Sequence, residues 1–160
     1  MKKSGLNADQ LESKFFEDWA EQALEQSTKD SYCALRGQAY LESMINALVE
    51  GFLVETTGLP PTFSAMCRLA KCLGLIPNDA WHNLTILGDI RNEFAHHLDE
   101  ITFDHPNLSD HFNKLTIKAS ETATKRERFI NACALLMQRM AILGEREKLK
   151  TPPPWHPKKD

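Results

Sequence analysis

The chain has 160 residues, of which 42% are hydrophobic and 26% are charged, and its formal net charge is −3 at pH 7. These values are typical of one soluble globular domain and exclude disordered and fibrous classes of protein. The apolar runs are far shorter than the ~20 residues that cross a bilayer, and the first residues lack the apolar core of a signal peptide. The sequence therefore favours a cytoplasmic protein without a membrane span.

Apolar residues recur at helical spacing almost throughout, and no alternating strand pattern competes with them. The first expected helix contains Leu11 to Leu24 and is capped by Asn7 or Asp9. Three more follow, from after Thr28 to Phe52, from about Phe63 to Leu73, and from Pro77 to Leu98. A short helix from Leu108 to Leu115 and a long one that begins near Thr122 or Thr124 complete the set. Gly74 is placed for a left-handed cap after the third of these.

The segments between and after these helices complete the expected organisation. Residues 101–106 are predicted to form a loop, and residues 149–160 form a Pro-rich extended tail. No internal repeat is present. The sequence predicts an all-α fold: a single-domain bundle of five or six helices over residues 1–148.

The cysteines and histidines give no sign of a metal centre. Cys33, Cys67, Cys72 and Cys133 have neither disulfide-framework nor zinc-knuckle spacing, and we expect four buried, reduced thiols. No pair of histidines has the His-x-x-x-His spacing that places two imidazoles on one helical face. Gly-rich phosphate loops are also missing from the sequence. We therefore expect no metal and no cofactor.

Charge is distributed unevenly along the chain. Residues 1–60 carry five Lys or Arg against ten Asp or Glu, whereas residues 124–150 carry seven against three. The acidic first part and the basic last helix are able to pair within the fold or across a dimer. Because acidic residues are in excess overall, direct binding to duplex DNA is not favoured, since neutralising many phosphates needs a clustered basic surface. Contact between a small basic patch and RNA stays open.

The segment from Asp89 to His97 carries the most informative polar residues. On a helix that turns about 100° per residue, Arg91 falls inside the apolar stripe. A polar flank beside that stripe holds Asp89, Asn92 and His96. Burying an unpaired guanidinium costs several kcal/mol, so we expect Arg91 to have a designated partner.

Two roles for Arg91 stay open. In the first, its guanidinium binds a carboxylate or the free carbonyls of a neighbouring loop, with Asp104 as one candidate, and fixes the turn after the helix. In the second, Arg91 clamps a phosphate while His96, held beside Asn92, exchanges a proton, because the pKa of imidazole lies close to neutrality. The expected binding residues are therefore Arg91, His96, His97 and Asp104.

Two resemblances to known families bear on these roles. The stretch Arg91-Asn92-Glu93-Phe94-Ala95-His96 resembles the Arg-polar-x-x-x-His signature of HEPN domains, all-α modules that include metal-independent ribonucleases with a site formed between two protomers. Roughly residues 35–145 resemble the mannitol operon repressor (MltR-like) family. The resemblance is carried by an ordered series of segments: residues 59–76 with their Phe-Ser start and Leu-Gly-Leu-Ile end, residues 87–96, and residues 103–104.

The resemblances imply different functions. The mannitol-repressor resemblance implies a dimeric or otherwise self-associating transcriptional regulator that lacks a helix-turn-helix and acts mainly through protein contacts. The HEPN resemblance implies the alternative, a ribonuclease in which His96 activates the ribose 2′-hydroxyl, Arg91 stabilises charge on the scissile phosphate and Asn92 orients His96. A third alternative, from the charge distribution, is an immunity or antitoxin-like protein that covers a basic partner with its acidic N-terminal part.

Charge around Arg91 argues against the ribonuclease alternative. Four carboxylates near Arg91 in the sequence repel an RNA backbone: Asp89, Glu93, Asp99 and Glu100. The basic residues of the last helix offset this repulsion only if packing brings them close: Lys125, Arg126 and Arg128.

Overall fold

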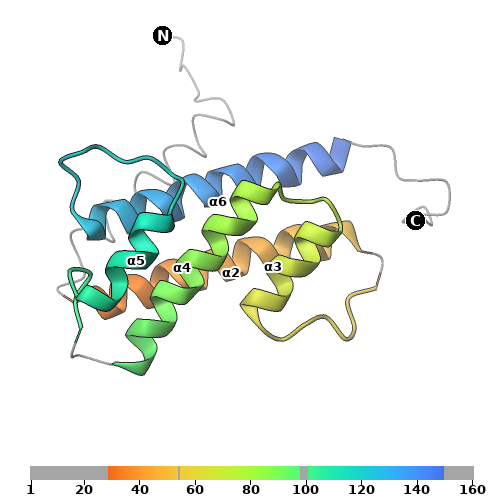
Figure 1. The fold of residues 1–160 in the computed structure, drawn as a ribbon. Coiled ribbons are helices and arrows are strands. Elements are labelled where there is room, and N and C mark those ends of the chain that lie inside the picture. Colours follow the sequence, from red (N-terminus) through yellow and green to blue (C-terminus); the bar gives the residue numbers. More distant parts are fainter. Residues whose placement is uncertain (1–28, 54, 98–100, 150–160) are drawn as a thin grey trace, which may run out of the picture.

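The structure, a computed structural model, describes residues 29–53, 55–97 and 101–149. These residues form five helices and no strand: α2 (Asp30–Phe52), α3 (Phe63–Cys72), α4 (Asn78–His96), α5 (Pro106–Lys114) and α6 (Lys125–Leu149). The predicted all-α bundle is confirmed (Figure 1). The helix expected over Leu11 to Leu24, Leu98 and residues 150–160 of the expected tail lie outside the described residues. None of the described helices has the length and apolar character needed to span a membrane.

Helices α2 and α6 run side by side in the same direction, and α4 crosses over them between α3 and α5 (Figure 1). The two long helices approach closely at Gly37 of α2, where an added Cβ would lie 2.8 Å from Cε1 of Phe129. Near their other ends, a Cβ on Gly144 would lie 3.8 Å from Cδ1 of Leu48. The absence of a side chain at Gly37 lets the buried Phe129 ring pack directly against the backbone of α2.

The loop between α4 and α5 is anchored in the core by Phe103. Its ring centroid lies 4.8 Å from that of Phe94 on α4, 5.1 Å from that of Phe129 on α6 and 6.1 Å from that of Phe112 on α5. All four rings are buried. The loop predicted before α5 is confirmed, and α5 begins at Pro106, whose missing N–H costs nothing at the first helical position.

Local caps set the ends of α3 and the start of α6. Gly74, which follows the C-cap residue Leu73 of α3, adopts a φ of +72°, and the N–H of Leu75 donates to the carbonyl of Ala70 at 2.9 Å. At α6, Oε2 of Glu127 accepts from the N–H of Thr124 at 2.7 Å, and Oγ1 of Thr124 accepts from the N–H of Glu127 at 3.2 Å. The predicted cap at Gly74 and the predicted start near Thr124 are therefore confirmed.

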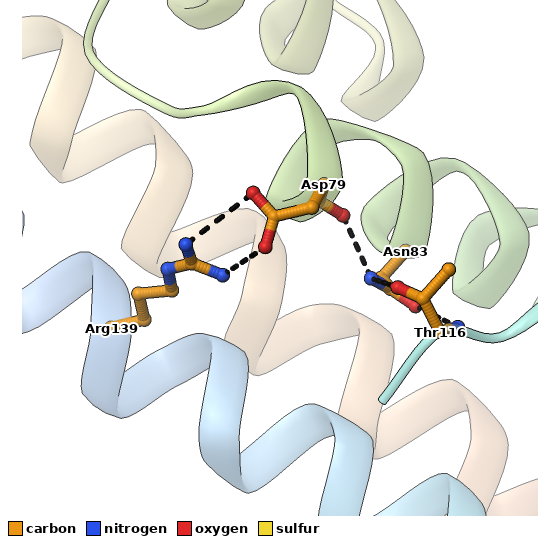
Figure 2. Close-up of polar contacts among 4 residues, drawn as sticks. All are labelled: Asp79, Asn83, Thr116 and Arg139. Atoms are coloured by element: carbon orange, nitrogen blue, oxygen red, sulfur yellow. Dashed lines mark hydrogen bonds and ion pairs between the residues drawn. The ribbon is translucent and has the colours of Figure 1, made fainter. Parts of the chain in front are cut away.

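Polar contacts tie α4 to α6 and to the segment after α5 (Figure 2). The carboxylate of Asp79 accepts from both terminal nitrogens of Arg139, at 2.5 and 3.3 Å. Asn83, only 2% exposed, donates to the Asp79 carbonyl and to Oγ1 of Thr116, each at 2.7 Å, and accepts from the N–H of Thr116 at 3.0 Å. The buried amide of Asn83 is therefore fully satisfied, and this offsets the cost of its burial.

All four cysteines are free thiols, but only three are buried. The prediction is wrong for Cys72, which is exposed, because residues five apart on a helix point about 140° away from each other and Cys67 faces the core. Burial raises the pKa of Cys33 to about 11 and that of Cys67 to about 12, so both remain protonated at neutral pH.

Candidate functional site

Arg91 is half-buried on α4 and lines a pocket shared with α2 and α3. Its Nη1 donates to Oδ1 of Asn92 at 3.3 Å, and its buried Nε has no hydrogen-bond partner. Within the described part of the chain, no carboxylate and no main-chain carbonyl accepts a hydrogen bond from the guanidinium. The structure therefore does not pair Arg91 with Asp104, which is exposed.

Asp30, the first residue of α2, fixes the turn after α4 in place of Arg91. Its Oδ2 accepts from the N–H of Phe103 at 2.9 Å, and its Oδ1 accepts from Nη1 of Arg126 at 3.2 Å. One carboxylate thus joins α2, α6 and the loop before α5. Asp30 is not among the residues predicted from the sequence. It lies 73 residues from Phe103 in the chain, and no local pattern links the two.

The pocket that contains Arg91 has a volume of about 330 Å³. Its walls come from three helices: Gln38 and Glu42 of α2; Thr62, Phe63, Ser64 and Cys67 at the start of α3; and Thr85, Gly88, Asp89, Arg91 and Asn92 of α4. Gln38 is only 6% exposed, and its Oε1 is buried without a hydrogen-bond partner. Two of the residues that line the pocket thus each carry one buried polar atom without a hydrogen-bond partner, Oε1 of Gln38 and Nε of Arg91, and neither atom is accessible from the pocket.

Gln38 and Glu42 are also not among the predicted site residues, although the sequence contains a signal for the first. Gln38 lies four residues after Ala34 and three before Leu41, so it falls in the buried stripe of α2. A polar residue buried in such a stripe needs a hydrogen-bond partner. The stripe identifies the residue but not the pocket that it faces, because the pocket depends on how α3 and α4 pack against α2.

His96 and His97 lie away from this pocket. Both are exposed at the end of α4, and His97 Nε2 lies 4.0 Å from Oε2 of Glu93. His96 follows Arg91 by five residues, which places the two side chains about 140° apart around the helix. His96 is not among the residues that line the Arg91 pocket. Within one protomer the two residues of the HEPN-like signature therefore do not share a cleft.

The basic residues at the start of α6 do not approach Arg91. Lys125 Nζ donates to Oγ of Ser109 at 2.9 Å, and Arg128 Nη2 donates to the carbonyl of Phe112 at 2.9 Å, so both contact α5. Arg126 contacts Asp30 on α2. These side chains hold the bundle together at that end and do not offset the carboxylates around Arg91.

No metal centre is formed by the residues that the structure describes, since no three of their His, Cys, Asp or Glu side chains are grouped to hold an ion. In comparisons with known protein families, curated proteins and solved structures, the chain matches none of them.

Proposed function

We propose that the chain is a regulatory binding module, similar to the mannitol operon repressors, that acts as a homodimer through contacts with other molecules and does not cleave RNA. The observation that carries this proposal is the separation of Arg91 from His96. Arg91 lines the pocket between α2, α3 and α4, whereas His96 is exposed at the end of α4 outside that pocket.

Because of this separation, one protomer does not hold both groups of the ribonuclease alternative in one cleft, and that alternative would need His96 of a second protomer beside Arg91. Cleavage without a metal needs a base at the ribose 2′-hydroxyl and a cation at the phosphate beside it, so both groups must reach neighbouring atoms. Arg91 shares its pocket with Glu42 and Asp89, whose carboxylates repel a phosphate backbone. The pocket thus suits a small bound molecule better than a nucleic acid strand.

The proposal is tested by comparing transcripts in native host cells that lack the chain with cells that carry the wild type or His96→Ala. RNA abundance and the positions of 5′ ends are measured on the same samples. A regulator changes the amounts of a limited set of transcripts and creates no new 5′ ends inside them. In parallel, purified protein is incubated with cellular RNA in the presence of a chelator, and no cleavage is expected.

Two results would overturn the proposal. One is a set of internal 5′ ends that requires the chain and disappears with His96→Ala, which would identify a ribonuclease. The other is a transcript profile that does not respond to loss of the chain, which would remove the regulatory role.

A further inference from the structure

We propose that residues 11–24 of this chain dock as an amphipathic helix on the outer face of α6, in a groove between α6 and the loop that joins α3 to α4. The inference does not rest on the proposed regulatory role. It stands on three observations: an exposed apolar strip on α6 beside a groove, the opposite charges of the two segments, and the short connection from the docking segment to α2.

The outer face of α6 carries an exposed apolar strip. Leu135 is 45% exposed and Ile142 is 42% exposed, although both are large hydrophobic residues. They are seven residues apart, which is about two helical turns, so their side chains lie on the same side of α6. Arg139 and Arg146, each four residues after one of them, fall on the same strip. Exposed apolar side chains gathered on one face mark a contact surface.

The strip borders a groove with a volume of about 490 Å³. One wall is formed by α6, through Arg139, Ile142, Leu143 and Arg146, and the other by the loop before α4, through Gly74, Leu75, Ile76 and Pro77. The guanidinium of Arg139 is shared with Asp79, and Arg146 is exposed. The groove therefore offers an apolar surface with positive charge beside it, which suits an acidic amphipathic helix.

Residues 11–24 have the pattern that such a groove fits. Leu11, Phe15 and Trp19 recur at steps of four residues and would form one apolar stripe on a helix, which Phe16 and Ala23 widen. Residues 9–26 carry six Asp or Glu against one Lys, whereas α6 carries six Lys or Arg against three Glu. Opposite net charges favour contact between the two segments.

The connection to α2 sets the direction of the docked helix. Lys29 has an extended backbone, with φ −112° and ψ 130°, so the chain changes direction directly before α2. Residues 25–29 form a five-residue connection, within the range of about 2–8 residues that joins neighbouring helices in bundles. Because α2 and α6 run in the same direction, a helix that reverses before α2 would run antiparallel to both.

The same connection sets the level of the docked helix along α6. Asp30 contacts Arg126, so α2 begins beside the first turn of α6. At 1.5 Å per residue, a helix over residues 11–24 is about 21 Å long, and Arg126 to Ile142 spans about 24 Å. Leu11 then lies at the level of Ile142, and Trp19 at the level of Leu135. A connection this short also favours docking on the same chain over a second copy, because it raises the effective concentration.

The first test is amide hydrogen exchange of the full-length protein, measured by mass spectrometry on peptides that cover residues 11–24. We expect these amides to exchange at least about tenfold faster in Ile142→Asp than in the wild type, since a carboxylate in the apolar contact releases the helix. Ile142→Leu should keep the wild-type rate. Arg146→Glu should also speed exchange, and Lys118→Glu is its matched control, because Lys118 is exposed between α5 and α6 and does not line the groove. Unchanged exchange of α4 amides shows that each variant is folded.

The second test is a disulfide between the docked helix and the groove. Cys72 is replaced by Ser, because it is the exposed cysteine, and Leu11→Cys is combined with Ile142→Cys. Under mild oxidation we expect a link within one chain, which migrates as a monomer on a non-reducing gel. Leu11→Cys with Lys118→Cys is the control and should form little of this product.

Several results would overturn the proposal. One is equal exchange of residues 11–24 in the wild type and in a folded Ile142→Asp variant. If Ile142→Asp also speeds exchange in α4, the disulfide decides: a covalent dimer as the main product would assign the groove to a second copy. Equal linking of Leu11→Cys to the control position would show that the segment has no fixed place. Failure of the transcript experiment would leave these results standing, because the measurements share no readout.

Discussion

The environment of Arg91 was only partly predictable from the sequence. Helical spacing predicts that it lies in the apolar stripe beside a polar flank, and the structure buries Arg91 in part while it exposes Asn92 and His96. The pocket that Arg91 lines was not predictable, because its other walls come from α2 and α3. Helical periodicity indicates the direction in which a side chain points from its own helix. Which residues lie in that direction depends on how the other helices pack against it.

Asp79 allows a test of how much an exposed ion pair contributes to the free energy of unfolding. Hydrogen bonding from Arg139 lowers the pKa of the Asp79 carboxyl. Both side chains are about half exposed (54% for Asp79 and 45% for Arg139), so solvent screens the pair. We expect Asp79→Asn to lower the free energy of unfolding by less than about 1 kcal/mol near neutral pH.

The sign of the Asp79 effect with pH follows from the direction of its pKa shift. Because the folded pKa is lower, the stabilisation is complete above the unfolded pKa, about 4, and is lost as the pH falls through the folded value. Urea denaturation at neutral and at acidic pH should therefore show a difference between Asp79→Asn and wild type that disappears in acid. Asp110→Asn, at an exposed position of α5, is the control. A difference that grows in acid would contradict this account.

At the scale of the elements, the described helices agree closely with those predicted from the sequence. Apolar periodicity and caps are local features, so the start of α6 at the Thr124 cap and the end of α3 at Gly74 were predictable. The prediction of four buried cysteines was wrong for Cys72, although its separation of about 140° from Cys67 indicates that the two side chains do not point the same way. The parallel pairing of α2 and α6 was not predictable, because no pattern in the sequence of either helix indicates which helix packs against it.

The close approach of α2 and α6 predicts opposite effects for one substitution at two sites of the same helix. Gly37→Ala should lower the free energy of unfolding by about 1–3 kcal/mol, since the new Cβ would meet the Phe129 ring at 2.8 Å. Gly51→Ala should raise it by up to about 1 kcal/mol, because that position of α2 has nothing within 4 Å and alanine favours a helix. Chemical denaturation of both variants measures the contrast. A stabilising Gly37→Ala would mean that the two helices are further apart.

At the scale of the whole molecule, Asp30 joins parts of the chain that are distant in sequence. It accepts hydrogen bonds from Arg126, 96 residues later, and from the N–H of Phe103. We expect Asp30→Ala to lower the free energy of unfolding by about 2 kcal/mol, because both of these hydrogen bonds involve a charged acceptor.

A double-mutant cycle tests the link between Asp30 and Arg126. The losses caused by Asp30→Ala and Arg126→Ala should not add in the double variant, since each substitution removes the same ion pair. Full additivity, within about 0.5 kcal/mol, would show that the two residues act independently.

The parallel pairing of α2 with α6 has a consequence for biosynthesis. The ribosome makes α2 early, and α3 and α4 soon cover part of its apolar face, but the part that packs against α6 is covered only when the last of the described helices has been made. The nascent chain must therefore leave the α6-facing part of this stripe uncovered until most of the polypeptide has emerged, a period in which chaperones have a binding target. Closing so long a loop late also makes folding slower than in a bundle of sequentially paired helices.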